Sequence, residues 1–393
     1  MSDELIVKQE DFAELCDHIR QSGLVAFDTE FVSEYTFRPQ LCLLQFATAD
    51  RQVAVDPFEL EDLTPWWDLM TDEKTTIVVH GGREEVRFCV NLAGKRPQKL
   101  IDVQIAQGLI GLSFPLGHTA LLSRVLGVEV YGKETRTDWR RRPLSDKQVH
   151  YAIEDVRHLL DVWRTQQATL EKRGRSSWAV AEFERMIDEI DAERTRENWR
   201  RLSGVNSLRS RDLAVARELY EWRSNEAEKR DRPARKILRD DLLIDVAKRQ
   251  PQTVNDLLAT RDMNRGPFYR DMAPSILEAI ARGRNLPKVE WPKQIRKEKE
   301  RDEQILGKLL SIALANRCAE QDVSMQLVGT TSDLKQLVRW HVYDKENGTV
   351  PRIAQGWRAE VCGDLLTDLL DGKITMRVGD LQSNHPIVFD EPE

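Results

Sequence analysis

The first 165 residues alternate between short apolar runs and amphipathic stretches. Residues 10–21 repeat apolar positions every three to four residues, which predicts a helix that Ser22-Gly23 ends. Three strand-like runs follow, at 24–31, 41–48 and 52–56. The short gap with Asp50-Arg51 between the last two runs indicates a hairpin. A further strand is expected at 75–80, followed by helices at 83–93, 103–111 and 117–126. This order predicts an α/β domain with an early antiparallel meander.

A second clear signal begins at Ser145. Ser145 and Gln148 have the spacing of a capping box, which predicts the start of a helix. Tyr151, Asp155 and Leu159 follow at intervals of four, so they are expected on one face of that helix.

The rest of the chain has the pattern of helices. Charge dominates from about 170 to 205, where we expect the first domain boundary. Beyond it, proline-separated helical segments predict a middle block, in which Pro274 is expected to precede the last helix. A proline- and lysine-rich linker then leads to a C-terminal block that is also predicted to be all-helical. The predicted domains are 1–190, the middle block 207–290 and the C-terminal block 300–382.

Composition narrows the class of protein. A chain of 393 residues exceeds the roughly 150 residues of one domain, so two or three are expected. Five scattered cysteines argue for reduced thiols in the cytoplasm and against a zinc or disulfide framework. No apolar run approaches the ~20 residues of a membrane span, and the N-terminus lacks the layout of a signal peptide. We therefore expect a cytoplasmic protein, a monomer, with no membrane partner.

Charge leaves a nucleic-acid partner open. The net charge of −7 does not suggest one, but positive residues gather at 136–143, 228–239 and 282–297. Each run alone is explained equally well as a solvated helix end or linker. Only a site for phosphodiester chemistry would change that interpretation.

Two pairs of residues are candidates for such a site. Asp28 and Glu30 lie two apart in a strand-like run, and Tyr151 and Asp155 lie four apart in a helix-like run, so each pair shares one face of its element. The neighbours of the first pair are apolar, and burying carboxylates without a partner is costly. Two divalent metals about 3.5–4 Å apart, held by about four carboxylates, can hydrolyse a phosphodiester. A D-x-E pair is often solvent-facing, however, and Tyr151 with Asp155 can also be structural.

The wider pattern resembles a known family. The motifs that carry the resemblance are F-D-T-E-F (27–31), P-Q-L-C-L-L-Q (39–45), V-V-H-G-G-R-E-E-V (78–86), I-D-V-Q-I-A (101–106) and T-D-W-R-R-R-P-L-S-D-K-Q-V-H-Y-A-I-E-D-V (137–156). They are similar to those of ribonuclease D, a 3′→5′ exoribonuclease of the DEDDy type. The resemblance implies a ribonuclease H-like fold, two Mg²⁺ or Mn²⁺ ions, and RNA with a free 3′ end, usually a tRNA precursor, as substrate. It implies a site of Asp28, Glu30, Glu85, Tyr151 and Asp155.

The two helical blocks resemble accessory domains. Residues 213–243 are similar to the HRDC domain, a helical nucleic-acid-binding module. Residues 356–373 are similar to the C-terminal region of ribonuclease D relatives, which implies a second, diverged HRDC domain. A helical scaffold without RNA contact is the alternative for the C-terminal block.

One position departs from the family. Five residues after His80 the family has an aspartate, and this chain has Glu85. Glu84 cannot readily replace it, because neighbouring helical residues point about 100° apart. We expect a working site, and its activity could be intact, slowed or shifted toward the larger Mn²⁺. The alternatives are an RNA-binding protein that has lost activity and a DNA 3′-exonuclease. His80 is expected to be structural, and Asp102 to be a helix N-cap.

Overall fold

A six-stranded mixed sheet forms the centre of the N-terminal α/β domain. The computed structural model describes residues 4–129, 137–194, 197–264, 267–294, 303–344 and 348–392. The strands are β1 (Glu4–Ile6), β2 (Leu24–Val32), β3 (Gln40–Ala47), β4 (Gln52–Val55), β5 (Thr76–Val79) and β6 (Leu100–Asp102). Their order is β1-β4-β3-β2-β5-β6; β3 is antiparallel to both β2 and β4, and β5 is parallel to both β2 and β6. The predicted meander and hairpin are confirmed.

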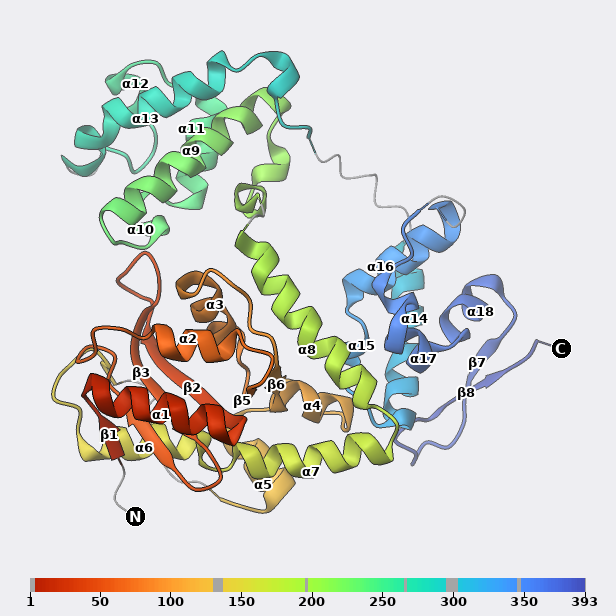
Figure 1. Ribbon diagram of the computed structural model, residues 1–393. Helices are drawn as coiled ribbons and strands as arrows, with labels where there is room; N and C mark the ends of the chain where they lie inside the picture. The colour runs from red at the N-terminus through yellow and green to blue at the C-terminus, as the bar shows by residue number, and fades with distance from the viewer. Residues whose placement is uncertain are drawn as a thin grey trace.

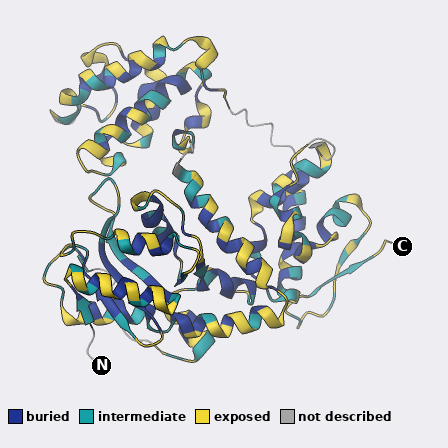
Figure 2. Cartoon of the chain, viewed as in Figure 1, coloured by how far each residue is buried: buried dark blue, intermediate teal, exposed yellow. Residues whose placement is uncertain are grey.

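Helices cover both faces of this sheet (Figure 1). They are α1 (Gln9–Ser22), α2 (Thr64–Met70), α3 (Arg83–Leu92), α4 (Val103–Leu109), α5 (His118–Leu126), α6 (Asp146–Arg157) and α7 (Leu159–Lys172). On one face Trp66 packs against Phe27 and Phe46, with ring centroids 4.6 and 4.7 Å away. On the other face, Ala26 of β2 packs with residues of α5 and α7. Because most residues of β2 and β3 are buried (Figure 2), a polar side chain on these strands needs a partner.

The helix that carries Tyr151 begins as predicted. Ser145 accepts a hydrogen bond from the backbone N–H of Gln148, and the Gln148 side chain accepts one from the N–H of Ser145, so the capping box is present. The helix is shorter than expected, because α6 ends at Arg157 and α7 begins at Leu159. Tyr151 and Asp155 remain one turn apart on α6.

The middle block is helical, as expected. Its helices are α9 (Ser210–Lys229), α10 (Ala234–Ile237), α11 (Asp240–Arg249), α12 (Val254–Leu258) and α13 (Pro267–Asn285). Their buried apolar residues form a core of their own, separate from that of the α/β domain. The expectation for Pro274 is wrong, since it lies inside α13. Proline removes only one backbone hydrogen bond there, and apolar residues such as Ala273 and Ile276 bury this part of the helix.

The C-terminal block is helical with one exception. Its helices are α14 (Glu303–Gln321), α15 (Met325–Val328), α16 (Thr331–Arg339), α17 (Gly356–Cys362) and α18 (Leu365–Asp371). The prediction that it is all-helical is wrong at its end, where β7 (Thr375–Val378) and β8 (Ile387–Asp390) form an antiparallel hairpin. Asn316 of α14 fixes β8, because its side chain bonds both the N–H and the carbonyl of Ile387, at 2.8 and 3.0 Å. The range 300–382 therefore divides this hairpin.

Helix α8 (Ser176–Asp191) joins the C-terminal block to the α/β domain. It lies in the charged stretch where only a boundary was expected. Trp178 of α8 stacks on Trp357 of α17 with ring centroids 5.3 Å apart. Beside them Arg358 donates to Glu182 at 2.6 Å, in a fully buried ion pair. The apolar cores of the C-terminal block and the α/β domain are therefore continuous.

Among the helices of the described ranges, none is both long enough and apolar enough to cross a membrane.

Candidate active site

Strand β2 places the first two carboxylates. Asp28 and Glu30 point to the face of the sheet that α6 covers, because strand side chains alternate. Their neighbours on β3 are Gln45 and Leu43, and a β-bulge follows Glu30. The bulge shifts the register of the pairing directly after Glu30, and the pairing resumes at Phe31 with Leu41. Helix α6 packs on this face of β2 and brings Asp155 and Tyr151 close to Glu30.

Glu85 comes from the opposite face of the sheet. It lies in the first turn of α3, which begins where β5 ends beside β2. Its side chain is 4% exposed, and its Oε1 accepts a hydrogen bond from the Thr29 hydroxyl at 2.6 Å. Glu84 instead forms an ion pair with Arg87. The sequence reasoning that Glu84 does not replace Glu85 agrees with this arrangement.

The carboxylates act on one another electrostatically. Burial raises the pKa of Asp28 well above its usual range, and the charges of Glu85, Asp155 and Glu30 raise it further. Burial, with the same neighbours, raises the pKa of Glu30 to about 8. It also raises the pKa of Glu85 to about 7 and that of Asp155 to about 6. Four acidic groups from three elements, one buried and three half-buried, therefore act on one another, and a cation between them would be favourable.

The four carboxylates have the right chemistry for a metal site, but their side chains are not arranged around an ion in this structure. Carboxylate oxygens are the ligands that Mg²⁺ and Mn²⁺ prefer. In the part of the chain that the structure describes, however, no three acidic, histidine or cysteine side chains form a set that could hold an ion as they stand. Ion binding would require these side chains to move closer together.

Two further residues contact Asp155. The Tyr151 hydroxyl donates a hydrogen bond to Asp155, and burial together with the Asp155 charge raises the pKa of Tyr151. His118 of α5 places Nδ1 3.4 Å from Asp155 Oδ1. Burial lowers the pKa of His118 to about 4, so its ring is neutral at neutral pH. Sequence reasoning missed His118 and Thr29, because neither belongs to a motif whose chemistry is legible without the fold.

Asp102 and His80 support the turn before α3. Asp102 caps α4 as expected, accepting from the N–H of Gln104 at 2.9 Å. It also accepts from the N–H groups of Gly81 and Gly82, at 3.0 and 3.1 Å, and so fixes the turn from which Glu85 follows. His80 Nε2 lies 2.8 Å from the Leu116 carbonyl, in agreement with a structural role.

A cavity of about 550 Å³ opens beside Glu30 and Tyr151. The loop after β2 forms one wall through Tyr35, and residues Asp138 to Arg140 form the other. Trp139 lies beneath, with its ring centroid 6.4 Å from that of Tyr151. The cavity is lined by charged and polar residues together with the aromatic rings of Tyr35, Trp139 and Tyr151.

The comparisons with known proteins agree with this geometry. The 3′-5′ exonuclease family matches residues 4–171, and the HRDC domain matches residues 212–280. The chain is 33% identical to ribonuclease D of Gluconacetobacter diazotrophicus over 377 residues, which cover 95% of this chain and 94% of that protein. The chain belongs to the ribonuclease D family. Ribonuclease D of Nitrobacter hamburgensis is 31% identical over 95% of this chain and 97% of its own length.

A solved ribonuclease D structure extends the likeness to the whole fold. The crystal structure of Escherichia coli RNase D, described as an exoribonuclease involved in structured RNA processing, matches with a TM-score of 0.82 at 27% identity. The match covers 94% of this chain and 99% of that one. The expected ribonuclease H-like domain followed by helical domains is confirmed. As a ribonuclease D the protein is a 3′→5′ exoribonuclease, and RNA is its substrate.

Proposed function

We propose that Asp28, Glu30, Glu85 and Asp155 bind two divalent metal ions, Mg²⁺ or Mn²⁺, and that Tyr151 completes the catalytic site. The observation that carries this proposal is the shared electrostatics of the four carboxylates. Glu85, Asp155 and Glu30 all raise the pKa of the half-buried Asp28. Groups that repel one another in a buried site are stabilised together by a cation.

The residues around the metal ligands have separate roles in this chemistry. Metal ions, when bound, supply an activated water and neutralise charge on the phosphoryl oxygens. Tyr151 has a raised pKa, so it acts as a neutral hydrogen-bonding group that orients the attacking water, not as a phenolate base. Neutral His118 orients Asp155, and the Thr29 hydroxyl holds Glu85.

We further infer a tRNA precursor as substrate, a monomer, and a place in the cytoplasm. Support for the substrate is the family itself, together with the cavity beside Glu30, which is large enough for a nucleotide. The five free, buried cysteines support a reducing compartment. The domain division 1–190, 207–290 and 300–382, with the last a diverged HRDC domain, also stays a proposal.

A metal-dependent digestion tests the assignment. The protein is incubated with a 3′-labelled RNA that carries a 3′ overhang, in Mg²⁺ or Mn²⁺, and release of mononucleotides is followed. Asp28→Ala and Asp155→Ala are expected to abolish release, and Tyr151→Phe to keep metal binding while losing most of the rate. Glu84→Gln is the matched control for Glu85→Gln, because it changes the neighbouring carboxylate, which pairs with Arg87.

The outcomes separate the candidate functions. Release that survives Asp28→Ala and Asp155→Ala contradicts the proposed site. Glu85, which is longer than the family's aspartate, is the one feature that favours an RNA-binding protein without activity. Tight RNA binding with no cleavage in either metal would establish that alternative. Digestion of DNA of the same sequence at an equal rate would indicate a DNA 3′-exonuclease.

A further inference from the structure

The loop between β2 and β3 connects the candidate active site to the middle block. It leaves the sheet after Val32, two residues beyond Glu30, and extends to α10 (Figure 1). Phe37, in this loop, packs against the apolar core of the middle block. Its backbone N–H donates to Asp231 Oδ1 at 3.0 Å, and Arg38 donates to Glu228 Oε1 at 3.0 Å. One short loop therefore makes three contacts with a domain far along the chain.

The three contacts of the loop differ in kind. The Arg38–Glu228 pair is exposed on both sides, and such pairs contribute little. The bond to Asp231 is more directional, because Asp231 adopts a left-handed conformation (φ 45°) in the turn after α9 and aims its carboxylate at the loop. The Phe37 ring adds the apolar contact. Within the loop the Thr36 hydroxyl donates to the Arg38 carbonyl at 2.6 Å, which stiffens the connection.

The same loop forms a wall of the cavity beside the catalytic residues. Ser33, Glu34 and Tyr35 line it, two to four residues before Phe37. The Tyr35 ring lies over Arg140 of the opposite wall, with the guanidinium carbon 4.6 Å from the ring centroid. Tyr35 is 57% exposed, so packing against the α/β domain holds little of its side chain. Its position therefore depends on the loop.

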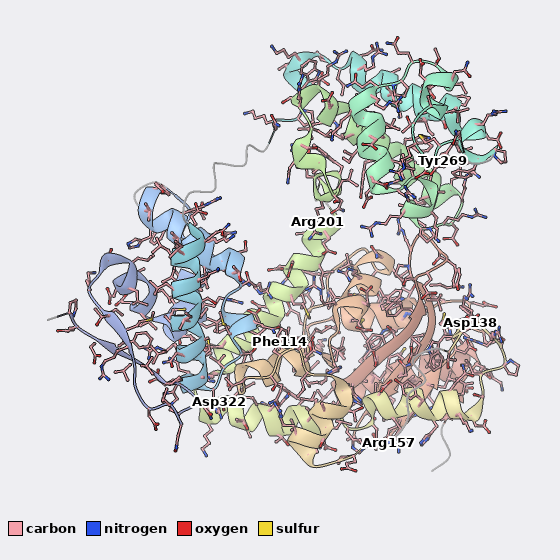
Figure 3. The ribbon with its side chains drawn as sticks, turned by 180° about the vertical axis from the view of Figure 1, so that it is seen from behind. Phe114, Asp138, Arg157, Arg201, Tyr269 and Asp322 are labelled. Atoms are coloured by element: carbon pink, nitrogen blue, oxygen red, sulfur yellow. The ribbon has the colours of Figure 1, made fainter. Side chains whose placement is uncertain are left out.

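The opposite wall is fixed by the α/β domain itself. Arg140 makes a bidentate pair with Asp138, at 2.9 and 3.0 Å. Arg142 donates to Asp56 and to the Cys42 carbonyl, both at 2.7 Å. Figure 3 shows Asp138 at this end of the sheet, below the helices that carry Tyr269. One wall of the cavity is thus held by the nuclease core and the other by the middle block.

We propose that Phe37 is a positioning residue, through which the middle block places Tyr35 at the cavity where the 3′-terminal nucleotides of RNA bind. The proposal rests on the proposed catalytic site. Aromatic rings stack on unpaired bases, and a guanidinium binds phosphate, so Tyr35 and Arg140 suit a single-stranded RNA end. The middle block then acts on RNA binding through this loop, in addition to any RNA contact of its own.

A double-mutant cycle tests this role. Phe37→Ala, Tyr35→Ala and the double variant are measured on a trinucleotide RNA, whose few nucleotides limit contacts outside the cavity. Phe37→Ala is expected to raise KM at least fivefold with kcat within twofold of wild type. Phe37→Leu, which keeps an apolar anchor, should restore most of the affinity. In the Tyr35→Ala background, Phe37→Ala should have no further effect, because coupled residues are not additive.

Three results would overturn the inference. They are an unchanged KM for Phe37→Ala, additive effects of the two substitutions, and a loss confined to kcat. If thermal melting shows that Phe37→Ala folds poorly, Asp231→Ala, which removes the acceptor of the Phe37 N–H, replaces it, and a KM change below twofold then decides against the proposal. A wild type that cleaves no RNA, or an Asp155→Ala variant that cleaves normally, would instead contradict the catalytic site.

Discussion

Replacing Thr29 with valine would remove one hydroxyl group from the candidate site while nearly keeping the shape of the side chain. Thr29 lies between Asp28 and Glu30 in sequence but points to the other face of β2. There its hydroxyl donates to Glu85 Oε1 at 2.6 Å. Both side chains are buried, at 6% and 4% exposure, so water cannot readily replace the donor. Thr29→Val therefore isolates the contribution of one hydrogen bond to the position of Glu85.

The magnitude follows from the charge of the acceptor. A hydrogen bond to a charged group contributes about 1.5–3 kcal/mol. At about 1.4 kcal/mol for each factor of ten, its loss corresponds to a roughly 10- to 150-fold weaker interaction. Burial already raises the pKa of Glu85 to about 7, and the Thr29 hydroxyl opposes that rise. Without the hydroxyl the pKa rises further, and a protonated carboxyl is a poor metal ligand.

The assay is a titration of RNA trimming with Mg²⁺ and with Mn²⁺. Thr29→Val is expected to shift the metal midpoint upward by at least tenfold at pH 7, and by less at pH 9, where Glu85 ionises even without the hydroxyl. Thr29→Ser, which keeps a hydroxyl, is the matched control and should stay close to wild type. A Thr29→Val enzyme with the wild-type midpoint at pH 7 would refute the reasoning. Equal losses in the serine and valine variants would refute it as well.

Three other substitutions test the site and its support. Glu85→Asp withdraws the carboxylate by about one carbon–carbon bond, ~1.5 Å, from Thr29, so trimming should fall roughly tenfold; a gain over wild type would show that the native site is detuned. Glu182→Ala leaves the Arg358 guanidinium buried and unpaired, and thermal or urea unfolding should show a loss of about 3–5 kcal/mol; a loss under 1 kcal/mol would contradict the pair's importance. Gly108→Ala would place a Cβ 2.6 Å from the Leu327 side chain of the C-terminal block, so unfolding should show a loss of about 1–3 kcal/mol, and unchanged stability would argue against this close packing.

Periodicity predicted the central elements of the fold well. The period of two in β2 and of four in α6 placed Asp28 with Glu30 and Tyr151 with Asp155, and the structure has all four on those elements. The short strands β1 and β6 were not predicted, because each has only three residues and therefore shows no periodicity. Pro274 misled, since burial in the middle block outweighs the lost hydrogen bond.

Only those residues of the candidate site that belong to a sequence motif could be predicted. Glu85 was predicted from the resemblance alone. The sequence of α3 does not distinguish Glu85 from Glu84; only the contact of Glu85 with Thr29 of β2 does. Thr29 and His118 contact the carboxylates through pairings that only the fold creates, across 56 residues for Thr29 and Glu85. The contact between Phe37 and the middle block is of the same kind. Partners that meet only through tertiary packing leave no local signal in the sequence.

Whether the extra methylene of Glu85 weakens the candidate site depends on how both ends of the side chain are held. A glutamate loses more rotamer freedom on burial than an aspartate, up to about 1.5–2 kcal/mol, and an unheld carboxylate would be a poor ligand. Here the backbone end is fixed, because Asp102 accepts from the N–H groups of Gly81 and Gly82 in the turn before α3. The carboxylate end is fixed by the Thr29 hydroxyl, whose bond is of similar magnitude to the entropy lost. Since both ends of Glu85 are held, the extra length of its side chain is compatible with a working exoribonuclease and carries little weight for an inactive RNA-binding protein.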